Sequence, residues 1–283
     1  MAPTIPQSGP HPDRRPDGVW PARWAFLASP PLDGVTNMAI DAALLDIVAE
    51  GDGTAVWRCY AWAQPTVSFG RNERTTGRFS DQSVRAAGLT AVRRPTGGRA
   101  LLHAREVTYS VTMRLDAQSP WQTGYAAVNA VLLRALHRLG VPAQLVAPHQ
   151  TRAVTPDGPL CFDQPAAGEI VVDGRKLVGS AVWRQGGAYL QHGSILLADD
   201  QPRLATAALC PMPLPPPAAT LAACASQQAE WAQVTDALSA ALSETVGLVT
   251  DGVVAPFSPD GDFASRMADH CRRFADPAWL WRR

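Results

Sequence analysis

The sequence predicts an α+β fold, with a mixed β-sheet and helices packed mainly on one face of that sheet. Three observations favour it: a series of short apolar strands, a three-stranded meander over residues 169–197, and a few separate amphipathic helices. The 283 residues are enough for one domain with a sizeable core. We expect a disordered, Pro-rich segment over 1–20 and a single domain over 21–283, with a Pro- and Ala-rich segment near 201–228.

The expected elements follow from apolar periodicity and from turn residues. In the N-terminal half these are a strand at 24–27, a helix at 38–50 capped by Thr36 or Asn37, two strands around Gln64-Pro65, a short helix at 81–88, and a strand, glycine loop and strand over 89–114. In the C-terminal half they are helices at 122–139 and 229–246, a strand at 141–146, the meander, and a last helix within 263–281.

Composition excludes several classes of protein. Charged residues make up 18% of the chain and the formal net charge is zero, which argues against nucleic-acid or anionic membrane partners. No apolar run reaches the roughly 18 residues that a membrane helix needs, and the N-terminus lacks a signal-peptide core, so we expect a cytoplasmic protein. The five cysteines form no C-x-x-C pair, so we expect reduced thiols and no metal site.

The meander contains the one lysine of the chain. Of 25 basic residues 24 are arginine, and the exception is Lys176, just after the Asp173-Gly174 turn. An ammonium can lose its proton when its surroundings lower its pKa, which a guanidinium cannot do in a protein, so Lys176 is a candidate functional residue; the alternative is chance survival of one lysine.

Cys161 precedes this meander and His192 lies in its third strand. A thiol, an amine and an imidazole on one sheet suggest acyl transfer with the thiol as nucleophile. Simple hairpin register pairs His192 with Ala181, on the opposite face from Lys176, unless Gly193 marks a bulge.

A second motif, residues 93–99, reads RRPTGGR and leads to His103. Adjacent glycines let backbone N–H groups approach a ligand, Arg94 could bind a phosphate or carboxylate, and Thr96 offers a hydroxyl donor. The alternative is a plain hairpin turn with solvated arginines.

Three stretches occur in this order: YAWAQPTVSFGR, RRPTGGRALLH and DGRKLVGSAVWRQGGAYLQHGSILL. Together they resemble the catalytic domain shared by lipoate–protein ligases, octanoyltransferases and biotin–protein ligases. The resemblance covers roughly residues 25–197 and implies a biotin/lipoate ligase-like fold. Within this family the chain is similar to the octanoyltransferase branch that acts on the glycine-cleavage H protein. The two points of similarity are a loop with two glycines rather than three and Cys161-Phe162 before the DGRK hairpin. The chain departs from the family at Ala104-Arg105, where an acidic residue is common, and at the PAAGE segment.

The resemblance implies a role for each matching residue. Cys161 would take octanoyl from acyl carrier protein as an enzyme thioester, and Lys176 would favour its thiolate and stabilise the carbonyl oxygen. The acyl group would then pass to a lysine of a lipoyl-domain protein, with neutral Lys176 or His192 as the base. The implied substrate-binding residues are Ser68, Gly70, Arg94, Thr96, Gly97, Gly98, His103, Val178, Gly179 and Ser180. His103 is equally consistent with a core histidine.

No cofactor is expected for this transfer. ATP enters only under the closest alternative, an ATP-dependent lipoate or octanoate ligase. Two further alternatives are an amidotransferase that moves the acyl group between lipoyl domains and a non-catalytic acyl-binding or lipoyl-domain-binding protein.

Overall fold

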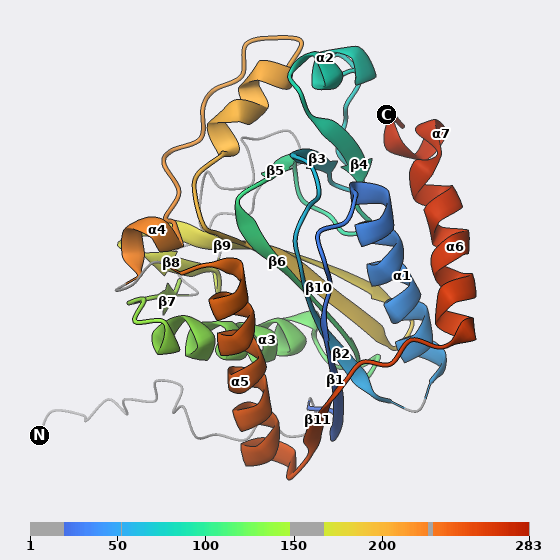
Figure 1. Ribbon diagram of the computed structural model, residues 1–283, viewed down its shortest axis with the longest axis vertical. Helices are drawn as coiled ribbons and strands as arrows, with labels where there is room; N and C mark the ends of the chain where they lie inside the picture. The colour runs from blue at the N-terminus through green and yellow to red at the C-terminus, as the bar shows by residue number, and fades with distance from the viewer. Residues whose placement is uncertain (1–19, 52, 148–166, 226–228, 283) are drawn as a thin grey trace, which may run out of the picture.

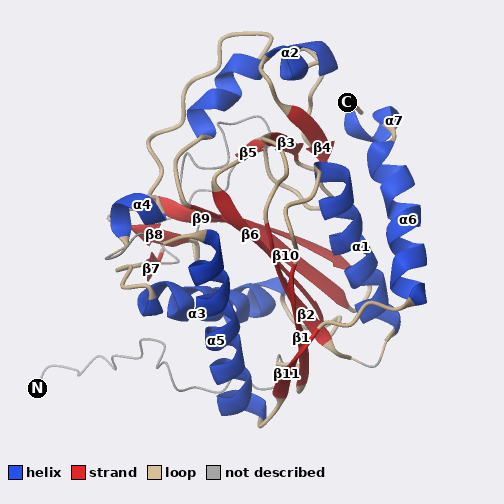
Figure 2. Cartoon of the chain, viewed as in Figure 1, coloured by secondary structure: helices blue, strands red, loops and turns tan. Residues whose placement is uncertain are grey.

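The computed structural model describes residues 20–51, 53–147, 167–225 and 229–282. The expected N-terminal segment therefore lies almost wholly outside the described residues, and so does Cys161. The architecture is an eight-stranded mixed sheet with a small three-stranded sheet above one end of it, and helices flank both (Figures 1 and 2).

The large sheet has the strand order β11-β1-β2-β6-β10-β9-β8-β7. Its strands are β1 (Arg23–Ala28), β2 (Ala55–Tyr60), β6 (Glu106–Arg114), β7 (Gln144–Leu145), β8 (Ile170–Val172), β9 (Arg175–Gln185), β10 (Ala188–Leu196) and β11 (Val253–Pro256). Strand β1 is parallel to both of its neighbours, and the other pairs are antiparallel. The small sheet has the order β4-β3-β5, built from β3 (Thr66–Phe69), β4 (Thr90–Arg93) and β5 (Leu101–His103).

The α-helices are α1 (Gly34–Glu50), α2 (Asp81–Ala86), α3 (Trp121–Arg138), α4 (Leu221–Cys224), α5 (Trp231–Thr250), α6 (Gly261–Ala275) and α7 (Pro277–Leu280), with a 3₁₀ helix η2 at Gln201–Ala207. None of the helices in this described part of the chain combines the length and apolar character needed to cross a membrane.

The α+β class and the mixed sheet are confirmed, but helices cover both faces of the sheet rather than mainly one. Strand β2 shows the reason, since all six of its residues are buried. Val56 packs toward α1 with Leu44, whereas Trp57 packs into the main core with Leu132 of α3 and Leu238 of α5. A central strand that is apolar on both sides needs a helical layer on each. Figure 1 shows α1 and α6 on one side and α3 and α5 on the other.

Two smaller expectations need correction. Helix α1 begins earlier than expected and is capped by Asp33, whose carboxylate accepts from the Thr36 N–H. The last expected helix is two helices, because Pro277 ends one and starts the next. The segment near 201–228 is partly packed where it is described: Leu204 and Leu221 are fully buried, whereas Leu209 and Leu214 are more than half exposed.

The meander is confirmed as β8, β9 and β10. Asp173 and Gly174 both have positive φ, as a two-residue hairpin turn requires. His192 pairs with Ala181, so no bulge intervenes at Gly193. Strand β8 pairs with β9 only as far as Val178. Beyond that residue no strand in the described ranges covers this edge of β9, and the edge borders the site.

Candidate active site

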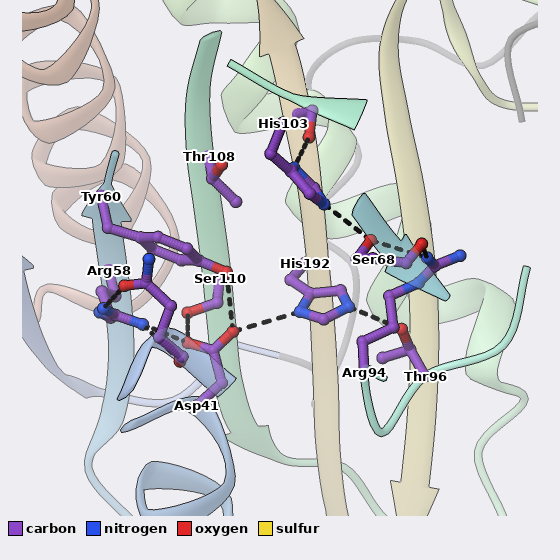
Figure 3. Close-up of polar contacts among 12 residues, drawn as sticks. Asp41, Arg58, Tyr60, Ser68, Arg94, Thr96, His103, Thr108, Ser110 and His192 are labelled. Carbon is purple, nitrogen blue, oxygen red and sulfur yellow. Dashed lines mark hydrogen bonds and ion pairs between the residues drawn. The ribbon is translucent and has the colours of Figure 1, made fainter. Parts of the chain in front are cut away.

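A partly open cavity of about 30 Å³ lies between α1, the small sheet and the central strands. Met38 of α1, Leu101 of β5, Gly179 of β9 and Gly193 of β10 line it. Its importance lies in the polar side chains around it, which form two hydrogen-bonded networks (Figure 3).

The first network centres on Asp41, which is fully buried in α1. Arg58 of β2 donates to Oδ1 at 2.8 Å, Ser110 of β6 donates to Oδ1 at 2.7 Å, and the Tyr60 hydroxyl donates to Oδ2 at 3.0 Å. Burial alone would raise the pKa of Asp41, but the hydrogen bond from His192 and the charge of Arg58 outweigh it and lower that pKa. The network therefore holds an ionised carboxylate beneath the cavity.

His192 connects this carboxylate to the loop between β4 and β5, residues 94–100, which we call the glycine loop. Its Nδ1 lies 3.2 Å from Asp41 Oδ2, and its Nε2 lies 2.6 Å from the Thr96 hydroxyl. Burial lowers the pKa of His192 more than Asp41 raises it, so the ring is neutral. A neutral ring that donates from Nδ1 to Asp41 accepts the Thr96 hydroxyl at Nε2. Both ring nitrogens are thus engaged, and the ring holds Thr96 in place.

The second network centres on His103 at the end of β5. Its Nδ1 lies 2.7 Å from Glu106 Oε1, its Nε2 lies 2.7 Å from the Ser68 hydroxyl, and the Trp62 ring stacks on it with centroids 4.0 Å apart. The family that the sequence resembles commonly has an acidic residue just after this histidine, where this chain has Ala104-Arg105. Glu106, at the start of β6, supplies the carboxylate instead.

Arg94 is buried and holds the glycine loop through hydrogen bonds to its backbone carbonyls. It is 4% exposed, and its guanidinium donates to the Ser68 carbonyl and hydroxyl, twice to the Gly97 carbonyl and once to the Arg99 carbonyl. These bonds occupy the five donors that a guanidinium has. Arg94 therefore fixes the loop's conformation with all of its hydrogen-bonding capacity.

Gly70 lets the loop lie close to the end of β3. A Cβ atom built on Gly70 would come within 1.9 Å of the Gly98 carbonyl oxygen, and Gly98 itself has a φ of +92°. Any side chain at 70 would push the loop away.

An open groove of about 510 Å³ adjoins the cavity and runs along the uncovered edge of β9, from Ser180 to Arg184. Its volume is typical of small-ligand sites. Gly97 and Gly98 border it on one side, and Trp121 and Tyr125 of α3 border it on the other. Ser180 and Ala181 line both the groove and the inner cavity.

Lys176 lies behind one wall of this groove. Its ammonium donates to Glu169 Oε1 at 2.7 Å, both side chains are at least nine-tenths buried, and Glu169 lines the groove. A buried ion pair of this kind is costly to assemble, which points to a functional role for it.

The implied site residues are divided between these two spaces. Those that line the cavity are Ser68, Arg94, His103, Gly179, Ser180 and His192; those that line the groove are Gly97, Gly98 and Ser180. Gly70 and Thr96 position the loop, and Val178 packs in the main core. Lys176 and His192 belong to different hydrogen-bond networks, as their opposite strand faces imply.

Cys161 falls outside the described residues. The thiols within them are Cys59, Cys210, Cys224 and Cys271, none of which lines the cavity or the groove. Burial raises the pKa of Cys59 to about 12, and burial also raises that of Cys271. Within the described ranges, no cluster of three or more His, Cys, Asp or Glu side chains could hold a metal ion.

Four important residues of the site were absent from the sequence expectations: Asp41, Arg58, Glu106 and Glu169. A signal existed for the first two, because Asp41 interrupts the apolar run MAIDAALL and Arg58 interrupts the strand AVWRCY. A charged residue within an apolar element is rarely buried unless it has a partner, so the two could have been paired.

Comparison with known proteins identifies the family of the chain. The family model described as the lipoyl protein ligase A/B catalytic domain matches residues 33–243. The chain therefore belongs to this family. Two solved structures share the fold: a lipoate-protein ligase A bound with ATP (TM-score 0.73, 18% identity, 92% of this chain and 98% of that one) and the bi-partite lipoate protein ligase of Thermoplasma acidophilum (TM-score 0.71, 18% identity, 92% and 96%).

Curated relatives are more similar in sequence. The octanoyltransferase LipM of Symbiobacterium thermophilum is 37% identical over 239 residues, which is 80% of this chain and 87% of that protein. The octanoyltransferase LipM of Kyrpidia tusciae is 40% identical over 182 residues, 62% of this chain and 66% of that protein, just under two thirds of its length. The chain is an enzyme of the acyltransferase class.

Proposed function

We propose that this enzyme is a carrier-protein:protein N-octanoyltransferase of protein lipoylation, acting in the cytoplasm. It takes octanoyl from acyl carrier protein and delivers it to a lysine of a lipoyl-domain protein such as the glycine-cleavage H protein. It needs no ATP or other cofactor, because the donor thioester is already activated. The observation that carries the proposal is the 37% identity to an octanoyltransferase over 80% of the chain.

The groove supports an acyl substrate. Trp121, Tyr125, Val182 and Trp183 give it apolar walls, and an octanoyl chain gains about 0.8 kcal/mol for each methylene that leaves water. The glycine loop places the backbone of Gly97 and Gly98 against the same space, where no side chain obstructs the carbonyl end of a ligand.

In the first step the Cys161 thiolate attacks the donor thioester, and the carrier leaves as a thiolate that takes a proton. Lys176 donates a hydrogen bond to the carbonyl oxygen as negative charge develops there. Exchange of one thioester for another is nearly neutral in free energy. In the second step the acceptor amine attacks the enzyme thioester, an amide forms, and Cys161 leaves.

The second step needs a proton acceptor, because a free lysine amine has a pKa of about 10.4 and arrives protonated. His192 is occupied on both nitrogens by Asp41 and Thr96. We therefore assign proton transfer to the Lys176–Glu169 pair, whose carboxylate faces the groove.

The rival function is an ATP-dependent ligase, favoured by the fold shared with a lipoate-protein ligase bound with ATP. A Cys161→Ala variant separates the two. With octanoyl carrier protein and a lipoyl domain, and no ATP, the wild type should octanoylate the domain and the variant should not. If ATP and free octanoate restore activity to the variant, or if the wild type needs ATP, the enzyme is a ligase.

A further inference from the structure

A chain of oriented hydrogen bonds connects the protein interior with the wall of the groove. It starts at Asn129 of α3, whose Nδ2 donates to the Gly168 carbonyl at 2.8 Å. Because a carbonyl can only accept, this bond fixes the orientation of the Asn129 amide and turns its Oδ1 toward Gln191 of β10. The Gln191 Nε2 donates to that oxygen at 3.0 Å. One backbone carbonyl therefore orients two buried side-chain amides.

The Gln191 amide in turn orients two hydroxyl groups. Its Oε1 accepts from the Tyr189 hydroxyl at 2.7 Å, and its Nε2 donates to the Tyr109 hydroxyl at 2.9 Å. The oxygen atoms of Tyr109 and Ser180 lie 2.7 Å apart. Tyr109 is fully buried and a buried donor needs an acceptor, so the Tyr109 proton is given to Ser180. Ser180 is thus left with its own proton to donate.

Both branches of this chain end at Tyr125, on the α3 wall of the groove. Burial and the charge of Glu169 raise the pKa of Tyr125 to about 12, and hydrogen bonding of its oxygen with the Asn129 and Ser180 side chains opposes this shift. Tyr125 therefore keeps its proton at neutral pH. No side chain or carbonyl in the described part of the chain accepts that proton, so the hydroxyl is a donor available to a ligand in the groove.

The place of this donor matches the place of the reacting carbonyl under the proposed function. Tyr125 lines the same groove as Glu169, Gly97 and Gly98. Lys176, the proposed donor to the carbonyl oxygen, is bonded to Glu169, whose charge also acts on Tyr125. A carbonyl oxygen that lies against the glycine loop and within reach of Lys176 is close to the Tyr125 hydroxyl as well.

We propose that Tyr125 is a catalytic residue of the acyl transfer, whose hydroxyl donates a hydrogen bond to the acyl carbonyl oxygen while that oxygen carries negative charge. The inference rests on the proposed function and adds a second donor to Lys176. As the Cys161 thiolate forms its bond to the carbonyl carbon, the π electrons move onto the oxygen, and they return when the carrier thiolate leaves. The proton stays on Tyr125 throughout.

The hydrogen-bond chain argues for this role over that of an apolar wall. Trp121 is such a wall, and it meets the Tyr125 ring edge-on with centroids 5.7 Å apart. A wall needs no control of its hydroxyl group, whereas buried side chains hold the Tyr125 oxygen from two branches. A donor that is oriented before charge develops stabilises the transition state more than the ground state.

The test is Tyr125→Phe, which keeps the ring and removes the donor. Thr123→Val is the matched control, because it removes a hydroxyl from the same helix that lines neither the cavity nor the groove. Single-turnover acylation by octanoyl carrier protein should slow on the order of 10²-fold in Tyr125→Phe, with little change in KM. Transfer onto a lipoyl domain should slow by a similar factor, since the same oxygen carries charge in both steps. Thr123→Val should match the wild type, and thermal unfolding checks that both variants fold.

Octanal separates catalysis from binding. The Cys161 thiol adds to the aldehyde carbon and its proton passes to the oxygen, which gives a tetrahedral hemithioacetal. Tyr125→Phe should weaken inhibition by octanal about tenfold, the contribution of one hydrogen bond. It should leave inhibition by octanamide unchanged, because the carbonyl of octanamide stays planar.

Three results would overturn the role of Tyr125. Wild-type rates in Tyr125→Phe would show that the hydroxyl is not used. Equal weakening of octanal and octanamide would make Tyr125 a binding wall. Slowing confined to transfer onto the lipoyl domain would assign Tyr125 to the acceptor amine. A wild type that is neither acylated by octanoyl carrier protein nor inhibited by octanal would instead show that the proposed function fails, which is distinct from a wild type and a Tyr125→Phe variant that are acylated equally fast.

Discussion

The inner cavity and the outer groove share a wall but differ in the state of their polar groups. Around the cavity, the side chains of Asp41, His192, His103 and Arg94 are already joined to protein partners. Among the residues that the structure describes, the groove has aromatic walls and one carboxylate, that of Glu169, which accepts a hydrogen bond from Lys176. The comparison teaches that Arg94 and His192, two candidates from the sequence, hold the glycine loop in place, while the groove offers open space beside that loop.

The largest expected effect is on stability, in the network beneath the cavity. Asp41→Ala should lower the free energy of unfolding by about 3–5 kcal/mol, because it leaves the Arg58 guanidinium buried without its carboxylate. Asp81→Ala removes an exposed ion pair and should cost about 0.3–0.5 kcal/mol. Denaturant titration measures both. Equal losses for the two variants would refute a structural role for the cavity network.

Changing Lys176 should affect rate rather than fold. Lys176→Arg keeps a cation beside Glu169 but misplaces the donor to the carbonyl oxygen, so the rate of enzyme acylation should fall by about 10²–10³-fold with little loss of stability. Single-turnover kinetics with octanoyl carrier protein give this rate. Arg175→Ala, at the exposed neighbouring position, serves as the control and should retain wild-type kinetics. Full activity in Lys176→Arg would show that any cation suffices.

Displacement of the glycine loop should give an intermediate effect. The methyl group of Gly70→Ala meets the Gly98 carbonyl, and a shift of about 1 Å at the groove is expected to cost on the order of 10²-fold in acyl transfer. Gly97→Ala has open space around its Cβ and should unfold like the wild type. Thermal unfolding and turnover assays compare the two. A normal turnover rate in Gly70→Ala would mean that the loop position does not matter.

The smallest effect is a pH dependence that arises from His192. Its folded pKa lies below the usual 6.5, so below that pH the unfolded chain binds a proton that the folded protein does not. Stability should therefore decrease as pH falls below about 6.5, by no more than about 1.4 kcal/mol per pH unit for this group. His192→Asn should flatten the decrease in urea titrations over this range. Parallel curves for the wild type and the variant would contradict a neutral, buried His192.

Local sequence signals predicted much of the fold. The Asp173-Gly174 and Gly186-Gly187 turns define the meander and the register of His192 against Ala181, because hairpin loops of two residues leave little freedom in pairing. The helices on both faces were not predicted, since a six-residue strand such as AVWRCY shows burial but not which element covers each side. Ion pairs between different elements, such as that of Asp41 in α1 with Arg58 in β2, were not predicted for the same reason.

Within the site, it was easier to predict which residues are functional than to predict the role of each side chain. Arg94 and His192 were identified as functional from their motifs, but a motif does not show that a side chain's donors are already occupied by Ser68, Gly97 or Thr96. Glu169 was read only as the start of a strand, because its pairing with Lys176 depends on how β8 and β9 meet.

The central claim is that Cys161 carries the acyl group before the acceptor receives it. Intact-mass spectrometry of the full chain, after mixing with octanoyl carrier protein in the absence of ATP, tests it most directly. The wild type should gain the mass of one octanoyl group, hydroxylamine should remove it, and Cys161→Ala should gain none. An unmodified wild type, or a modification that persists in Cys161→Ala, would contradict the account.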